Sequence, residues 1–248
     1  MTQQTRQWLR EMRLPAMDRA YTQQLELPAS NSLSFDERFA LLVQAEWESR
    51  NNKKLTRLLK TANLRDKNAC LEEIDFQKSR NIEKNVVANL AGCSWIRKGH
   101  NLLISGSCGT GKTYLLSAFG NAACRNGYSV RCFRIPRLLM DMHIGRGDGS
   151  WDKILKSLKK PELLILDDFG LAPLEPLQCR DFLEVIEDRH GSASIIVASQ
   201  LPVSSWHSVF ADATIADAVL DRLLQNAHRF ELKGPSRRNH IFSSVENV

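Results

Sequence analysis

Apolar runs and amphipathic segments alternate along most of the chain. Five short runs are continuously apolar or alternate between apolar and polar positions, which is typical of β-strands; they lie at residues 101–105, 128–133, 163–166, 194–198 and 229–232. Between them, apolar residues recur every three or four positions, as on one face of a helix, at 112–125, on both sides of 145–149 within 136–160, and at 177–190. This order predicts an α/β fold in which helices cover both faces of a parallel sheet.

The first 70 residues show helical periodicity without a strand pattern. Apolar positions around Trp8 predict a helix that ends before Pro15, and a polar stretch with Pro28 predicts a loop. Two amphipathic segments then follow, separated by the polar pair Asn51-Asn52. Their apolar positions are Phe39, Leu42, Val43 and Trp47 in the first and Leu55, Leu58, Leu59 and Ala62 in the second. We therefore expect two helices with a break between them, in a helix-turn-helix-like bundle.

A glycine-rich segment joins the first predicted strand of the α/β part to its first helix. Residues 106–113 read Gly-Ser-Cys-Gly-Thr-Gly-Lys-Thr and match the phosphate-loop pattern G-x-x-x-x-G-K-[ST]. Glycines let the main-chain N–H groups curl around a phosphate chain above the positive end of the helix. Lys112 supplies a compact charge to the terminal phosphates, and the Thr113 hydroxyl is a ligand for Mg²⁺. The expected nucleotide-contacting residues are Gly106, Ser107, Cys108, Gly109, Thr110, Gly111, Lys112, Thr113 and Tyr114.

An acidic pair, Asp167-Asp168, ends the apolar run at 163–166. Ligands of open parallel sheets gather at the carboxyl ends of the strands, so this pair is expected beside the phosphate loop. We assign Asp167 to Mg²⁺ and Asp168 to the orientation and polarisation of an attacking water. Asp168-Phe169-Gly170 is also a protein-kinase triplet, but the rest of the kinase signature is missing and the glycine loop is of the other type.

The positive charge of the chain is concentrated in one segment. The whole chain has a net charge of +6, and residues 50–67 alone hold seven basic residues against one acidic residue, which is the same excess. A solvated helix face is one explanation, but such a concentration in a nucleotide-binding protein favours a nucleic-acid partner. The candidate DNA-binding residues are Arg50, Lys53, Lys54, Arg57 and Lys60.

Composition is that of a globular protein, with 43% hydrophobic and 25% charged residues in 248. No apolar stretch reaches the ~18 residues of a membrane span, and the N-terminal residues show no signal-peptide pattern. The six cysteines form no C-x-x-C pair and show no zinc-ligand spacing with histidine. We therefore expect a cytoplasmic protein with reduced thiols and without a membrane partner.

The strand at 128–133, between the phosphate loop and the acidic strand, marks the additional-strand class of ATPases. Within that class the chain resembles the AAA+ family, and specifically the IstB-type transposition helpers of its IstB/DnaC-like branch. The resemblance covers nearly the full length and is carried by residues 41–55, 106–113, 163–170, 198–202, 221–230 and 233–238. It implies a P-loop AAA+ three-layer sandwich at 71–248 and a small helical DNA-binding or oligomerisation domain at 1–70. We expect no C-terminal helical lid of the kind that many AAA+ proteins carry, because the residues after Ser236 leave no room for it.

The resemblance also assigns roles to single residues. Gln200 matches the polar sensor of the γ-phosphate, and Arg222 matches the arginine finger that reaches a neighbouring subunit's nucleotide. Arg238 matches the second sensor, with Arg237 beside it as the alternative. Asp168 stands where most AAA+ proteins have glutamate, and this shorter side chain implies slow turnover suited to a switch.

The implied function is that of an ATPase that assembles as an oligomer on double-stranded DNA, with ATP at the subunit junctions, and activates a partner transposase. A DnaC-type helicase loader is the main alternative; it would prefer single-stranded DNA. A small-molecule kinase would need an acceptor pocket and a lid, for which the sequence offers no support. A nucleotide-dependent scaffold without hydrolysis is a third alternative, against which Asp168 and Gln200 argue.

Overall fold

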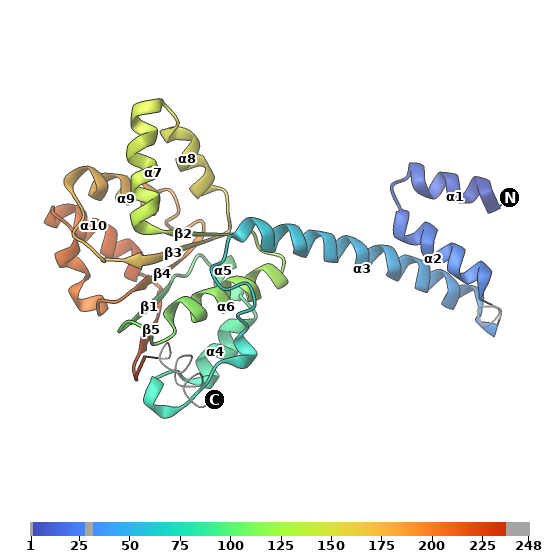
Figure 1. Ribbon diagram of the computed structural model, residues 1–248, viewed down its shortest axis with the longest axis horizontal. Helices are drawn as coiled ribbons and strands as arrows, with labels where there is room; N and C mark the ends of the chain where they lie inside the picture. Colours follow the sequence, from blue (N-terminus) through green and yellow to red (C-terminus); the bar gives the residue numbers. More distant parts are fainter. Residues whose placement is uncertain (1, 28–31, 237–248) are drawn as a thin grey trace, which may run out of the picture. The chain divides into compact units, whose positions relative to one another are not determined.

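The computed structural model describes residues 2–27 and 32–236, which fall into two compact units on either side of the Arg57–Leu58 bond (Figure 1). Each unit is described by itself. The loop expected around Pro28 and the second sensor at Arg237 or Arg238 lie outside the described residues. The division of the chain into functional domains at 1–70 and 71–248 stays a prediction.

Three helices make up the described part of the first unit. They are α1 (Thr2–Glu11), α2 (Pro15–Glu26) and the greater part of α3 (Phe35–Ala62). The predicted end of the first helix before Pro15 is confirmed, and this proline then starts α2, a helix that the sequence pattern did not reveal. The Glu46 carboxylate of α3 accepts hydrogen bonds from the first N–H groups of α2, those of Ala16 (2.8 Å) and Met17 (3.1 Å). A side chain of α3 thus caps α2, which has no cap of its own.

The predicted break at Asn51-Asn52 is wrong, because α3 runs through it without interruption. Asparagine lowers helix propensity by well under about 1 kcal/mol, and the flanking turns offset that cost. Arg50 pairs with Glu46 one turn earlier, at 2.9 Å. The predicted helix-turn-helix-like bundle is therefore wrong as well, because it required two separate helices in place of α3. The apolar positions Phe39, Val43 and Trp47 are also largely uncovered, with exposed fractions of 50%, 47% and 65%.

The second unit is built on a five-stranded sheet in the order β2-β3-β4-β1-β5, and all neighbouring strands are parallel. The strands are β1 (Leu102–Gly106), β2 (Val130–Arg134), β3 (Leu163–Phe169), β4 (Ser194–Ser199) and β5 (His228–Leu232). All five predicted strands are confirmed, and β3 continues through the acidic pair. The first four residues of β1 and all of β4 are buried, as expected for strands covered on both faces.

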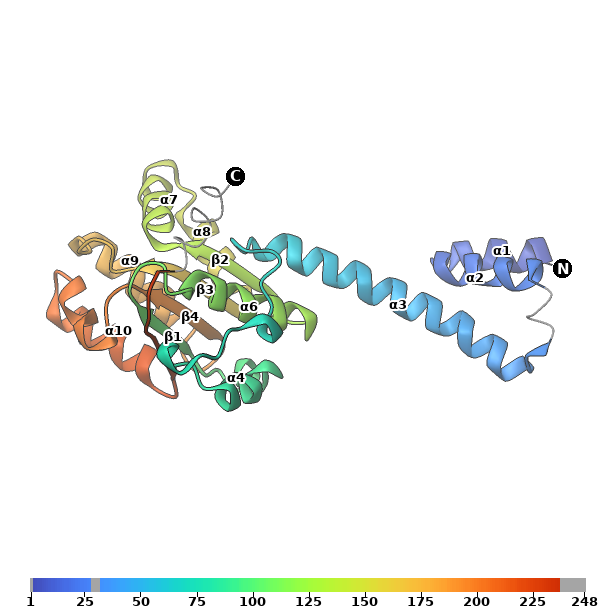
Figure 2. The same cartoon turned by 60° about the horizontal axis from the view of Figure 1, so that its bottom comes forward.

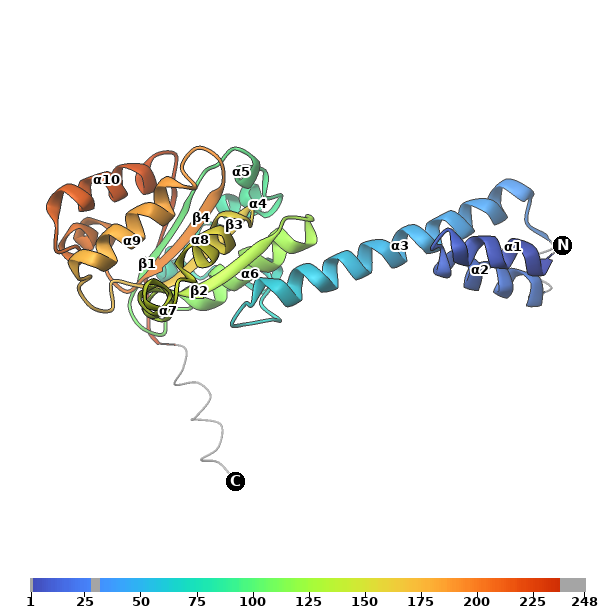
Figure 3. The same cartoon turned by 90° about the horizontal axis from the view of Figure 1, so that it is seen from above.

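Helices cover both faces of this sheet (Figure 1). The helical segments of the second unit after α3 are η2 (Leu71–Glu73), η3 (Lys78–Arg80), α4 (Lys84–Ala91), α5 (Ser94–Arg97), α6 (Lys112–Arg125), α7 (Ile135–Asp148), α8 (Trp151–Lys159), α9 (Pro176–Glu187), η4 (Val203–Val209) and α10 (Ala213–Leu224). One layer contains α6 with α4 against it, and α7 and α9 with their neighbours α8 and α10 form the other; the views in Figures 2 and 3 agree. The predicted three-layer α/β architecture is confirmed.

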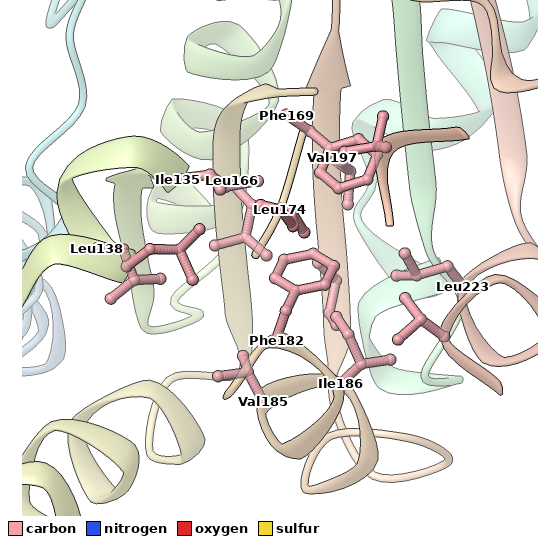
Figure 4. Packing of buried hydrophobic residues seen from close by; sticks show 14 of the residues in the cluster. Ile135, Leu138, Leu166, Phe169, Leu174, Phe182, Val185, Ile186, Val197 and Leu223 are labelled. Carbon is pink, nitrogen blue, oxygen red and sulfur yellow. The ribbon is translucent and has the colours of Figure 1, made fainter. Parts of the chain in front are cut away.

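A hydrophobic core lies between the sheet and the layer of α7, α9 and α10 (Figure 4). Leu166 and Val197 of the central strands meet Phe182 and Ile186 of α9 there, and Phe169 stacks on Phe182 with ring centroids 5.5 Å apart. Phe169 is the last residue of β3, so this packing holds the carboxyl end of the strand in place. The acidic pair directly before it is thereby fixed at one edge of the sheet. None of the helices in the described part of the chain is long and apolar enough to cross a membrane.

Candidate nucleotide site

The phosphate loop connects β1 to α6 in a conformation that requires glycine. Gly106, Gly109 and Gly111 have φ angles of 147°, 83° and 97°, which side chains rarely adopt. A Cβ on Gly106 would overlap the carbonyl oxygen of Leu232, and one on Gly111 would lie 3.0 Å from the Arg80 guanidinium. The expected order of strand, glycine loop and helix is therefore present, and at Gly106 the neighbouring backbone also leaves no room for a Cβ.

Lys112 opens α6 and turns its ammonium group back over the loop. Its Nζ donates to the carbonyl oxygens of Gly106 at 2.6 Å and Ser107 at 2.8 Å. Thr110, which is 2% exposed, donates to the same Ser107 oxygen at 2.9 Å. These side-chain contacts stabilise the curl of the loop from within.

A cavity of about 600 Å³ lies beside the loop, a volume within the range of small-ligand sites. Its lining includes eight of the expected residues: Cys108, Gly109, Gly111, Lys112, Thr113, Tyr114, Asp168 and Gln200. The other half of the lining was not expected from the sequence: Arg65, Asp66, Glu73, Ile74, Asp75, Arg80, Ile82 and Leu115. Most of these residues belong to the segment between α3 and β1, residues 63–101, which we call the connector and which has no motif of its own. The hint that its sequence gives is its recurring apolar residues, of which Ile74 and Ile82 are buried beside the cavity.

Tyr114 and Arg80 tie this connector to the loop. The Tyr114 hydroxyl donates to the Cys70 carbonyl at 3.2 Å and accepts from the Cys70 N–H at 3.3 Å. Arg80 donates to the Thr110 carbonyl at 3.1 Å and to the Asp75 carbonyl at 2.7 Å. The connector therefore forms one wall of the cavity.

Asp167 is placed to hold a cation together with Thr113. The Thr113 hydroxyl lies 3.2 Å from Asp167 Oδ2, and Asp167 is only 1% exposed. Burial, and then the charge of the neighbouring Asp168, raise the pKa of Asp167. A divalent cation offsets both effects, and a hydroxyl and a carboxylate oxygen are ligands that Mg²⁺ prefers. The residues therefore fit the expected metal.

Asp168 has an unusual backbone conformation, with φ of 64°. The pairing of β3 with β4 shifts register between Leu166 and Phe169, and such irregularities re-aim side chains next to functional sites. The Asp168 carboxylate receives a hydrogen bond from Arg134 Nε at 2.7 Å, and Arg65 lies 3.6 Å from the same oxygen. These contacts hold a strained residue toward the cavity.

The other expected catalytic residues lie at two different edges of the sheet. Gln200 follows β4 and lines the cavity with Asp168. Arg222 lies on α10 at the amino edge, where Asn101, the residue before β1, donates to its carbonyl oxygen at 3.3 Å. The Arg222 guanidinium donates to Glu187 at 2.7 Å and to the Ala218 carbonyl at 2.7 Å. The structure thus brings Gln200, but not Arg222, to the chain's own cavity.

The expected DNA-binding residues are all exposed, and Arg50 also has an intramolecular role. Lys53, Lys54 and Arg57 lie on the surface of the first unit, and Lys60 on that of the second. Arg50 pairs with Glu46 and donates to the Arg13 carbonyl at 3.0 Å. It therefore connects α3 to the segment between α1 and α2.

These features define a P-loop protein of the AAA+ class: a parallel sheet in the order β2-β3-β4-β1-β5, a phosphate loop between β1 and α6, and an acidic pair on β3. The chain belongs to the family of IstB-like ATP binding proteins, whose family model matches residues 7–244. The family resemblance and the AAA+ fold expected from the sequence are thereby confirmed.

Two relatives show what the chain is similar to. It is 49% identical to a Pseudomonas fluorescens protein named as the ATP-binding protein of insertion sequence IS1162, over 83% of this chain and 89% of that protein. It is 41% identical to the Sinorhizobium fredii protein named as insertion sequence ATP-binding protein y4pL, over 94% of both chains.

Solved structures share the fold. The structure of DnaI has a TM-score of 0.57 at 21% identity and covers 73% of this chain and 93% of its own. The structure of the DnaC helicase loader has a TM-score of 0.55 at 21% identity, over 67% of this chain and 97% of its own. At this identity the likeness concerns the fold alone.

Proposed function

We propose that the chain is the ATPase of an insertion sequence, which binds and hydrolyses ATP with Mg²⁺, assembles on duplex DNA and regulates a partner transposase. One observation carries the proposal: residues of the phosphate loop, Asp168 and Gln200 line a single cavity of about 600 Å³, and Asp167 contacts Thr113 of that lining. The names of the relatives support the link to ATP and to insertion sequences.

Each side chain of the cavity has a defined task in this proposal. The loop amides and Lys112 bind the phosphates, and Thr113 with Asp167 hold Mg²⁺. The metal supplies neutralisation of phosphate charge. Asp168 accepts a proton from the attacking water, and Gln200 orients that water toward the terminal phosphate. Binding of ATP between subunits stabilises the assembly by mass action, and hydrolysis reverses that effect.

The position of Arg222 supports a site shared between subunits. It lies at the amino edge of the sheet, opposite the edge that carries the cavity. It can therefore serve as a finger only toward the nucleotide of another copy. An arginine of this kind contributes about 10³–10⁵ in rate in related triphosphatases.

The exposed basic residues of α3 are the proposed DNA contacts. Contacts of lysine and arginine to phosphates depend little on base sequence, which suits a protein that selects target sites broadly. A helicase loader is the second candidate function, since the DnaC structure has the same fold. Tighter binding to duplex than to single-stranded DNA of equal length supports the transposition helper, and the opposite preference supports the loader.

The proposal is tested with Lys112→Ala and the control Lys153→Ala, which removes an exposed lysine of α8 away from the cavity. We expect the wild type and the control to bind a fluorescent ATP analogue and to release phosphate faster with duplex DNA, whereas Lys112→Ala does neither. Equal nucleotide binding by all three proteins would refute the assignment of the loop. A requirement for an added phosphate acceptor would instead indicate a small-molecule kinase.

A further inference from the structure

Arg65 lies in the cavity wall between two anchored segments of backbone. Before it, Ala62 is fully buried and Leu64 is 5% exposed, and a Cβ on Gly120 of α6 would lie 2.7 Å from Leu64 Cδ2. After it, the Asp66 N–H donates to the Ser117 hydroxyl of α6 at 3.4 Å. The position of Arg65 is therefore fixed by the packing of its neighbours on α6.

The Arg65 side chain extends to the oxygen that the proposed function assigns to Mg²⁺. Its guanidinium lies 3.3 Å from Asp167 Oδ2 and 3.6 Å from Asp168 Oδ2. Asp167 Oδ2 is also the atom that the Thr113 hydroxyl contacts at 3.2 Å. A guanidinium and a metal ion cannot both occupy the open side of this one oxygen.

Arg65 matters more to Asp167 than to Asp168, because the two carboxylates differ in their other cationic partners. Asp168 has a second cation, Arg134 at 2.7 Å, whereas Arg65 is the one ion-pair partner of Asp167 among the described residues. The Asp167 side chain is 2% exposed and that of Arg65 is 42% exposed. Arg65 can therefore withdraw into solvent at little cost, while the buried Asp167 carboxylate is stabilised by a positive partner.

We propose that Arg65 is a positioning residue of the nucleotide site that holds the Asp167–Asp168 pair before the metal arrives and yields Asp167 to Mg²⁺. It acts as a built-in competitor of the cation and so sets the Mg²⁺ concentration at which nucleotide binds. This inference rests on the proposed nucleotide site.

The test measures binding of fluorescent ADP during a titration with Mg²⁺, independently of hydrolysis. For Arg65→Gln we expect the Mg²⁺ midpoint to fall about fivefold, the effect of one partly exposed ion pair. Without Mg²⁺, the same variant should bind the nucleotide more weakly than wild type, because two carboxylates then repel the phosphates. The control Arg137→Gln, which removes an exposed partner of Asp141 on α7, should match the wild type in both respects.

Arg65→Lys keeps the positive charge but lacks the planar guanidinium group. The Mg²⁺ midpoint of its nucleotide binding should therefore fall only about twofold. Thermal unfolding of each variant establishes that it folds. An unchanged or raised Mg²⁺ midpoint in Arg65→Gln, or in Arg65→Lys if the glutamine variant does not fold, overturns the role of Arg65. Absence of nucleotide binding by the wild type would instead overturn the proposed function itself, so the two failures are distinguishable.

Discussion

Individual residues of the site fall into those that a local motif specifies and those that only the fold brings in. The phosphate loop is contiguous, and its glycines and Lys112 follow from its own sequence. Asp167 and Asp168 follow from their place at the end of an apolar run. Arg65 and Arg80 could not be predicted in the same way, because their contacts to Asp167 and Thr110 join positions far apart in the sequence.

Asp168 gives a prediction at this scale. Asp168→Asn keeps the size of the side chain but cannot accept a proton, so hydrolysis should fall at least about 100-fold while ATP binding stays close to wild type. Phosphate release and equilibrium binding of a fluorescent analogue measure the two effects. Asp141→Asn, a surface change on α7, is the control. Retention of full hydrolysis by Asp168→Asn would remove this residue from the chemistry.

Among the elements, the strands and the first helix were predictable, whereas α2 and the continuity of α3 were not. Buried parallel strands are short apolar runs, and each of the five lies within a few positions of its predicted ends. The polar pair at 51–52 suggested a break, yet helix propensity is a weak signal that contacts along α3 override. Helix α2 could not be predicted locally because its N-terminus is capped by Glu46 of α3, a contact with a distant segment.

Ion pairs between α1 and α2 hold these two helices together as a hairpin, and they predict how the stability of the hairpin depends on pH. Arg10 and Arg6 donate to Asp18 at 2.8 Å and 2.9 Å, and these hydrogen bonds lower the pKa of Asp18. A lowered folded-state pKa means that the stabilisation is present above the unfolded value of 3.8 and is lost as the pH falls through the folded value.

We therefore expect Asp18→Asn to increase amide exchange of α1 at neutral pH and to abolish the acid dependence of that exchange below about pH 4. Hydrogen exchange at matched intrinsic rates measures both effects. Asp217→Asn, an exposed carboxylate on α10, should leave α1 unchanged. Equal protection of α1 in Asp18→Asn and wild type would show that the two arginines do not stabilise the hairpin.

At the scale of the whole molecule, the cavity and Arg222 lie at opposite edges of one sheet, and this separation determines how they can work together. The sequence predicted the sheet and its loop, and the family resemblance supplied the role of Arg222. Neither could show that Arg222 bonds within its own chain to Glu187 and the Ala218 carbonyl. In the proposed finger role these bonds are exchanged for a phosphate, so we expect the finger to form only on contact between copies.

Mixing two inactive variants tests this arrangement. Arg222→Ala should bind ATP without hydrolysing it, and Lys112→Ala should lack the nucleotide. In mixed assemblies, some junctions combine the intact loop of the first with the intact Arg222 of the second, and hydrolysis should return there. Size analysis confirms that the variants assemble together. No recovery in any co-assembled mixture would exclude the finger role.

Basic residues of α3 give a further expectation for the assembled protein. Lys54→Ala combined with Arg57→Ala should weaken duplex binding and make its salt dependence shallower by about two units of slope, because each substitution removes one cation from a DNA phosphate. Lys84→Ala combined with Lys153→Ala removes the same charge from exposed positions on α4 and α8 and serves as the control. An unchanged slope in the α3 variant would mean that these side chains face only solvent.

The pairing of β5 with β1 has a consequence for how the protein is made. The Leu232 carbonyl of β5 lies where a Cβ on Gly106 would be, so the last strand closes against the first glycine of the loop. On the ribosome, residues 106–113 emerge long before that strand exists. A polypeptide whose synthesis stops early therefore carries the glycine motif without the strand that packs against Gly106.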